Sequence, residues 1–289
     1  MKLLAIDLDG TLLNHKKNIS KVNLAAIKDA QDNGVEVIIA TGRAYFDAVK
    51  ICREAGLSTK IISSNGAMIH TEKGELLHSF AMENNVVERS IKFLEDTELY
   101  YEVTTDNGIY TPHRCRDVLA IEVDRLTSAN PEISKEKLLA DTQKQFTQTG
   151  FTFVNHYQDI LHTNEAVYNI LAFSLDEEKR QQGWAYFTEQ ENLTVVSSAD
   201  NNFELQHHEA SKGNAVQLVA NMLNIPLSET VAIGDSHNDL SMLKKVGYSV
   251  AMGNAKQEIK DICHMTTLLN DEHGVAHAII HKINEKISL

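Results

Sequence analysis

Two aspartates near the start of the chain are the first residues whose type and spacing could do chemistry. Residues 7–11 read DLDGT and directly follow a short, mainly apolar run at 2–6. Because strand side chains repeat every two residues, Asp7 and Asp9 would point to the same side. Two carboxylates held so close repel one another unless a cation neutralises them. The pattern therefore favours a cation-dependent acidic site over its alternative, a solvated acidic turn.

A threonine and a glycine follow a second apolar run, VEVIIA at 35–40. Thr41 offers a hydroxyl, and Gly42 would let an oxyanion approach the backbone N–H groups at the start of the next helix. A threonine that only caps this helix explains the same pattern equally well.

A lysine at the start of the helix predicted over 211–223 is the third signal. The positive end of the helix dipole disfavours a cation there, so Lys212 is expected to face an anion. An ordinary surface lysine is the alternative interpretation.

The run GDSHND at 234–239 follows another apolar run, TVAI at 230–233. Asp235 and Asp239 are four residues apart and would share one helical face if the helix begins early. Helix capping by Asp235 or Ser236 is the structural alternative. Together with Asp7 and Asp9, these carboxylates favour an oxygen-ligand Mg²⁺ site.

The elements that must position these residues alternate between strand and helix. Such alternation predicts parallel pairing in an α/β sheet covered on both faces, with ligands bound outside the carboxyl ends of the strands. Strands are predicted at 2–6, 35–40, 60–63, 230–233 and 248–251, and helices at 20–33, 44–55, 211–223, 237–246 and 274–286.

The middle of the chain has a different pattern and predicts an inserted α+β unit over 82–198. Asn107 and Gly108 lie between β-rich flanks over 100–112, which is a strong hairpin signal. Helices are predicted at 115–127, 134–148 and 176–191, and strands at 167–175 and 193–198. The core is then formed by 1–81 and 199–289.

Composition narrows the class of partner. The 289 residues contain 27 Lys and Arg against 40 Asp and Glu, for a net charge of −13, and no basic run stands out. This argues against a nucleic-acid partner or an anionic membrane surface, while a local cation site still admits a small phosphorylated substrate. No apolar run approaches the ~18 residues that cross a bilayer, and the first ends too early for a signal peptide. Three widely spaced cysteines fit reduced thiols, so we expect a cytoplasmic protein.

The four motifs DLDGT, TGR, SKG and GDSHND together resemble the haloacid dehalogenase-like hydrolase superfamily. Further matches are SNGA at 64–67, AMGNA at 251–255 and the segment 270–275, a set that resembles the Cof-type phosphatases. The resemblance implies a Rossmann-like parallel-sheet core with an α/β cap inserted after the second motif. It also implies Mg²⁺ as cofactor and small phosphorylated metabolites, such as sugar phosphates, as substrates.

The resemblance assigns roles that suit the chemistry. Asp7 would be the nucleophile that forms an aspartyl-phosphate, and Asp9 would act as general acid and then general base. The Asp7 carboxylate, the Asp9 carbonyl and Asp235 would bind Mg²⁺. The phosphoryl oxygens would be held by Leu8, Thr41, Gly42, Lys212 and Asn238. The residues expected to orient these groups are Asp239, Ser236, Arg43 and Asn65.

Two other functions use the same residues. A phosphomutase would return the phosphoryl group to its substrate, and a non-catalytic protein would only bind a phosphorylated ligand. One segment departs from the family pattern, because 207–210 read HHEA where relatives usually have a small glycine-containing turn. The sequence specifies neither the physiological substrate nor the oligomeric state.

Overall fold

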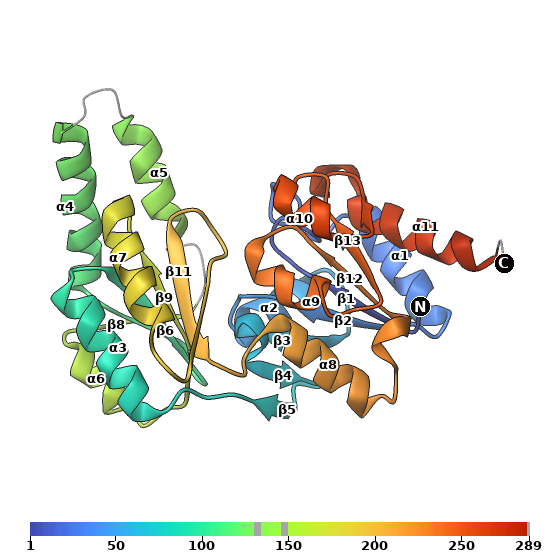
Figure 1. Cartoon of the computed structure of the whole chain (residues 1–289), viewed down its shortest axis with the longest axis horizontal. Helices are drawn as coiled ribbons and strands as arrows, with labels where there is room; N and C mark the ends of the chain where they lie inside the picture. Colours follow the sequence, from blue (N-terminus) through green and yellow to red (C-terminus); the bar gives the residue numbers. More distant parts are fainter. Residues whose placement is uncertain (130–133, 146–149, 288–289) are drawn as a thin grey trace. The chain divides into compact units, whose positions relative to one another are not determined.

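The computed structural model describes residues 1–129, 134–145 and 150–287. The chain forms two compact units: the first contains Met1–Ser79 and Ala210–Leu289, and the second contains Phe80–Glu209 (Figure 1). The predicted limit at 198 falls short of the second unit's last residue. The reason is β11 (Asn202–His207), which pairs antiparallel with β10 (Leu193–Val196) and β9 (Val167–Phe173).

The first unit is built on one eight-stranded sheet with the order β14-β13-β12-β1-β2-β3-β4-β5. The six strands from β14 to β3 pair parallel, and five of them were predicted from the sequence. The parallel strand β14 and the antiparallel edge of β4 and β5 were not predicted. Their bounds are β1 Leu3–Ile6, β2 Glu36–Ala40, β3 Lys60–Ser63, β4 Met68–His70, β5 Leu76–Ser79, β12 Thr230–Gly234, β13 Tyr248–Ala251 and β14 Met265–Thr266.

Helices cover both faces of this sheet. Leu4 and Ile6 of β1 pack in one apolar cluster with residues of α1, α2 and α11, while Leu3 and Ala5 pack in a second cluster with residues of α8, α9 and α10. The strand therefore buries alternate residues on opposite faces. The bounds are α1 Lys21–Asp32, α2 Tyr45–Glu54, α8 Lys212–Met222, α9 Leu240–Leu243, α10 Gln257–Ile262 and α11 Gly274–Ile287.

Serine caps fix where two of these helices begin. The Ser20 side chain accepts a hydrogen bond from Asn23 N, and that of Ser211 accepts one from Asn214 N, so Lys212 is the first residue of α8. The helix predicted over 237–246 is shorter and broken, because a three-ten turn at His237–Asp239 precedes α9.

The second unit has a six-stranded sheet with the order β10-β11-β9-β6-β7-β8. The predicted hairpin is confirmed: β6 (Tyr100–Thr105) and β7 (Ile109–Pro112) pair antiparallel around Asn107 and Gly108. The remaining elements are β8 Phe151–Val154, α3 Asn84–Asp96, α4 Arg114–Ala129, α5 Lys135–Gln145, α6 Tyr157–Leu161 and α7 Glu177–Thr188. The last residues of the helix predicted over 134–148 lie outside the described residues. Among the helices that the structure describes, none combines the length and apolar character needed to cross a membrane.

Candidate active site

Three neighbouring strands of the first unit bring the predicted acidic and phosphate-binding residues to one edge of the sheet. Asp7 follows β1, Thr41 follows β2 and Asp235 follows β12, and β1 lies between the other two in parallel. Parallel strands that end at the same edge must place the residues after them close together. The topology thus accounts for the convergence of residues that are far apart in sequence.

Lys212, the first residue of α8, forms ion pairs with two of the carboxylates. Its Nζ atom lies 2.7 Å from Asp7 Oδ1 and 2.6 Å from Asp239 Oδ1, and its side chain is fully buried. Burial alone would lower the pKa of Lys212, but the charges of Asp239 and Asp7 raise it above the usual value, so the ammonium stays charged. An ammonium has three N–H donors, and these two bonds leave one for an oxyanion.

Both carboxylate oxygens of Asp239 accept hydrogen bonds from groups of the protein. Its Oδ1 atom accepts a hydrogen bond from Lys212 Nζ, and its Oδ2 atom accepts hydrogen bonds from the backbone N–H groups of Asp235 (2.9 Å) and Ser236 (3.1 Å). Ser236 and Asp239 cap the three-ten turn reciprocally. This carboxylate therefore positions the lysine and the Asp235 backbone.

Asp235 is held by residues from two other loops. Its Oδ1 atom accepts a hydrogen bond from Thr11 Oγ1 at 3.0 Å, and its Oδ2 atom lies 3.4 Å from Asn254 Nδ2. Asn254 also donates to the Gly10 carbonyl at 2.8 Å. Gly10 has φ +78°, and any Cβ there would clash with the Asp235 carboxylate. The AMGNA run carries part of the family resemblance, but Asn254 was assigned no role; an asparagine three residues after the end of a strand was the available signal.

The acidic cluster has the composition of a Mg²⁺ site. Asp7, Asp235 and Asp239 each place one carboxylate oxygen within 4.8 Å of the others, and Asp7 Oδ2 is buried without a hydrogen-bond partner. Burial raises the pKa of Asp7 well above its usual range, with Asp239 adding to the shift and Lys212 opposing it. Burial, followed by the charge of Asp239, raises the pKa of Asp235 to about 7. Crowded, buried carboxylates of this kind suit a hard divalent cation.

Asp9 points its carboxylate at basic residues. Arg43 Nε lies 2.6 Å from Asp9 Oδ2 and Arg43 Nη2 lies 2.8 Å from Asp9 Oδ1, while Lys17 Nζ lies 2.8 Å from Oδ1. Arg43 is held in turn by an ion pair with Asp47. Burial alone would raise the pKa of Asp9, but Arg43 and then Lys17 lower it to about 2. In this arrangement Asp9 is ionised and suited to accept a proton; donating one requires its release from Arg43.

Thr41 does not cap the helix that follows it. The N-cap of α2 is Ala44, and Thr41 Oγ1 instead accepts the backbone N–H of Arg43 at 3.1 Å. The capping interpretation of Thr41 is thereby wrong. The hydroxyl keeps its own proton available for donation to an oxyanion.

Asn65 links the loop after β3 to the turn that carries Asn238. Its backbone N–H donates to the Thr41 carbonyl at 2.9 Å, and its Oδ1 atom accepts from Asn238 Nδ2 at 2.9 Å. Ser236 Oγ is 2.7 Å from Asn238 Oδ1. Asn65 adopts φ +53°, an uncommon left-handed conformation for a residue with a side chain. These contacts orient the Asn238 amide and leave its second N–H for a ligand.

Gly42 and Leu8 can contribute only backbone groups. A Cβ on Gly42 would lie 2.9 Å from Asn65 Oδ1, so a side chain there would displace the Asn65 amide. Leu8 buries its side chain in the core of the first unit, and its carbonyl accepts the N–H of Leu13 at 2.9 Å. The predicted phosphate contacts of both residues therefore reduce to N–H groups.

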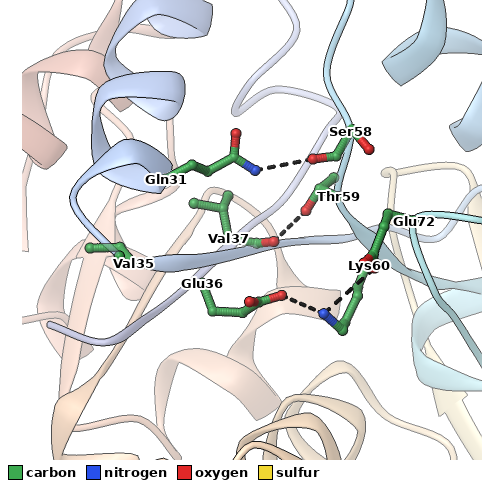
Figure 2. A pocket seen from close by; sticks show the side chains of 9 residues that line it. Gln31, Val35, Glu36, Val37, Ser58, Thr59, Lys60 and Glu72 are labelled. Atoms are coloured by element: carbon green, nitrogen blue, oxygen red, sulfur yellow. Dashed lines mark hydrogen bonds and ion pairs between the residues drawn. The ribbon is translucent and has the colours of Figure 1, made fainter.

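A cavity of about 370 Å³ lies elsewhere in the first unit (Figure 2). It is lined by residues at the amino ends of β2 and β3, including Glu36 and Lys60. Lys60 Nζ is paired there with Glu36 at 2.6 Å and Glu72 at 3.6 Å (Figure 2). Its position at the opposite strand ends separates this cavity from the acidic cluster.

The second unit holds a buried polar network that the sequence analysis missed. Asn169 Nδ2 donates to Glu204 Oε2 at 3.0 Å, and Gln206 Nε2 donates to Asn169 Oδ1 at 3.3 Å. Glu102 accepts from Tyr100 at 2.7 Å, and burial raises its pKa to about 8. The alternation of apolar and polar residues in NFELQH of β11 was the available signal, since it places Glu204 and Gln206 on one face.

Comparison with known proteins agrees with this geometry. A sequence profile described as haloacid dehalogenase-like hydrolase matches residues 4–279. The chain belongs to the haloacid dehalogenase-like hydrolases. It is 47% identical to the phosphatase YwpJ of Bacillus subtilis over 97% of this chain and 99% of that protein. It is 36% identical to the 5-amino-6-(5-phospho-D-ribitylamino)uracil phosphatase YwtE of the same organism, covering 96% and 97% of the two chains.

Solved structures support the same assignment. A haloacid dehalogenase-like hydrolase from B. subtilis, 47% identical, superposes with a TM-score of 0.86 over 97% of this chain and 99% of that one. The subclass IIB sugar phosphatase BT4131 shares the fold with a TM-score of 0.77 at 21% identity, over 98% and 99% of the two chains. The predicted family, fold class and enzyme class, a hydrolase of the phosphatase type, are confirmed.

Proposed function

We propose that this hydrolase is a Mg²⁺-dependent phosphatase that removes phosphate from small phosphorylated metabolites through an aspartyl-phosphate on Asp7. One observation carries the proposal: the buried Asp7–Lys212–Asp239 cluster beside Asp235 at the carboxyl ends of β1 and β12. It combines an aspartate with a free oxygen, a fixed positive charge and a second carboxylate. A non-catalytic phosphate-binding protein has no need of this nucleophile.

The side chains divide the reaction between them. Asp7 attacks phosphorus, and the bond to the leaving oxygen breaks as Asp9, protonated once its carboxylate has left Arg43, gives that oxygen a proton. A water molecule then attacks the aspartyl-phosphate and passes its proton to Asp9, releasing inorganic phosphate and restoring Asp7. Lys212, with Thr41 and Asn238, holds the phosphoryl oxygens throughout. Fixed donors matter here because the transition state spreads charge over those oxygens.

Mg²⁺ would be held by the Asp7 carboxylate, the Asp9 carbonyl and Asp235. When bound, the ion neutralises charge on the carboxylates and on the phosphoryl group. Asp235 is already fixed for this task by Thr11 and Asn254. Arg43 and Asn65 act by orienting Asp9 and Asn238.

The second unit would act as the cap that selects the substrate. Its sheet carries the Glu102, Asn169, Glu204 and Gln206 network, which is rich in hydrogen-bond acceptors. Acceptors of this kind recognise leaving groups with hydroxyl or amine donors, as sugar phosphates have. The name of the relative YwtE adds a ribitylamino-uracil phosphate to the candidate substrates.

A panel of phosphorylated metabolites, assayed for phosphate release with Mg²⁺ or with EDTA, tests the proposal. The panel contains sugar phosphates, the ribitylamino-uracil phosphate and one aryl phosphate. We expect Mg²⁺-dependent release with one phosphate per substrate consumed, and none from Asp7→Asn. Conversion of a substrate to its isomer without phosphate release would instead show a phosphomutase. Binding without any turnover would show a ligand-binding protein.

A further inference from the structure

Three metal-ligating side chains lie next to one another in the second unit, apart from the acidic cluster of Asp7, Asp235 and Asp239. His207, His208 and Glu209 each place a ligand atom within 4.8 Å of the others. His207 is the last residue of β11, and His208 and Glu209 are exposed. The assigned chemistry of the enzyme makes no use of them.

The orientation of His207 suits a metal ion. Its Nδ1 atom accepts the backbone N–H of Glu209 at 3.2 Å, so the Nδ1 lone pair faces the segment that supplies the other two ligands. A metal ion could bind this lone pair in place of the 3.2 Å hydrogen bond from the Glu209 N–H.

The cluster also lies where the chain enters and leaves the second unit. Phe80 is the first residue of this unit and Glu209 is the last. The Phe80 ring stacks on the His207 ring with centroids 5.8 Å apart and planes 12° apart. The stacked rings bring the two connecting segments together at the histidine, so an ion bound there would add to the restraint on both segments.

We propose that His207, His208 and Glu209 form a second metal site that binds a borderline transition-metal ion such as Zn²⁺. Two imidazoles and one carboxylate are a recognised zinc ligand set with an open fourth position. Mg²⁺ prefers oxygen ligands, so it would fill the acidic cluster and leave this one free. The two sites are thus separated by the chemistry of their ligands.

Calorimetric titration of the whole protein with Zn²⁺, in a large excess of Mg²⁺, tests this site. We expect one Zn²⁺ ion per chain, bound at least about tenfold more weakly by His208→Gln and by Glu209→Gln. His281→Gln is the matched control: it removes an exposed histidine from α11, where the His277 and His281 rings lie 6.4 Å apart. X-ray absorption of the zinc complex should show two imidazole nitrogens.

Other results would overturn the proposal. Wild-type protein that binds no Zn²⁺ in the presence of Mg²⁺ has no such site. Loss of binding in His281→Gln with normal binding in His208→Gln would move the site to α11. Loss in Asp7→Asn, with only oxygen ligands in the absorption spectrum, would place the zinc in the acidic cluster. Because binding is read directly, a variant with altered phosphatase activity does not confuse the result.

Discussion

The two units of the molecule bury ionisable groups in contrasting ways. In the first unit, the buried Lys212 lies between the carboxylates of Asp7 and Asp239, so opposite charges offset the cost of burial. In the second unit, the buried carboxylate of Glu204 accepts hydrogen bonds from two uncharged groups, the Asn169 amide and the Ser198 hydroxyl. The first arrangement fixes opposite charges in place, whereas the second holds a carboxylate with neutral hydrogen-bond donors.

This contrast separates the chemical step from the choice of substrate. A phosphoryl group is the same in every substrate, and fixed charges stabilise it best. Leaving groups differ in their hydroxyl and amine donors, and a neutral or adjustable acceptor network distinguishes them. Glu102, whose pKa is about 8, is protonated at neutral pH and can donate as well as accept. Substitutions in the first unit should therefore change the activity on every substrate by the same factor. Substitutions in the second unit should change it by a different factor for each substrate.

The largest effect is expected from Asp7→Asn. The change removes the nucleophile with almost no change in volume, so turnover should fall at least ~10⁴-fold on every substrate. The fold should survive, because one of three crowded acidic groups is neutralised. Phosphate release and circular dichroism check these two points, with the exposed Asp32→Asn as control. Substantial activity in pure Asp7→Asn protein would contradict the covalent mechanism.

Lys212→Ala should lower turnover by about 10²–10³-fold, again uniformly across substrates, because one fixed charge-stabilising donor is lost. Lys212→Arg should restore little, since a planar guanidinium does not replace a compact ammonium between two carboxylates. The control is Lys244→Ala, which changes an exposed lysine of the same unit. Steady-state kinetics on two substrates measure the effect; a Lys212→Ala enzyme as active as wild type would mean that the phosphate binds elsewhere.

The positions of these first-unit residues could be predicted because parallel strands carry them to one sheet edge. Asp7, Thr41 and Asp235 each follow an apolar run that is long enough to be a strand, and local sequence specifies that much. Local sequence does not specify which groups a carboxylate meets. Asp239 accepts two backbone N–H groups of its own turn, but it meets Lys212, 27 residues away in sequence, only after α8 has packed against the turn at His237–Asp239.

The second unit was harder to predict because its strands depend on distant partners. Residues 202–207 form β11 only by pairing with β9 and β10, so their short alternating sequence did not identify a strand. The predicted boundary at 198 therefore missed this strand, and with it Glu204 and Gln206. The same dependence hid the polar network, since Asn169 and Glu204 are 35 residues apart.

A smaller effect, confined to the first unit, should appear in the pH dependence of Mg²⁺ binding. The pKa of Asp235 is raised to about 7, so below pH 7 the ion must displace a proton from this carboxylate. The apparent affinity should fall at least about tenfold per pH unit below 7, because the Asp7 carboxyl, whose pKa is also raised, must lose its proton as well. Calorimetry at pH 6, 7 and 8, in buffers of different ionisation enthalpy, measures affinity and released protons together. Equal affinity at pH 6 and pH 8 would show that Asp235 is not a ligand.

The smallest effect tests the contrast between the two units most directly, because it should differ between substrates. Glu204→Gln keeps the size of the side chain and its ability to accept from Asn169, so the second unit should remain folded. It removes one acceptor oxygen, and a donor-rich leaving group should lose about 1 kcal/mol of binding, or roughly fivefold in kcat/KM. A small aryl phosphate lacks such donors and should be unaffected. Kinetics on three metabolites and one aryl phosphate, with the exposed Glu191→Gln as control, measure the ratio. If Glu204→Gln lowers kcat/KM for all four substrates by the same factor, the polar network does not select the substrate. The proposed division between the two units then fails.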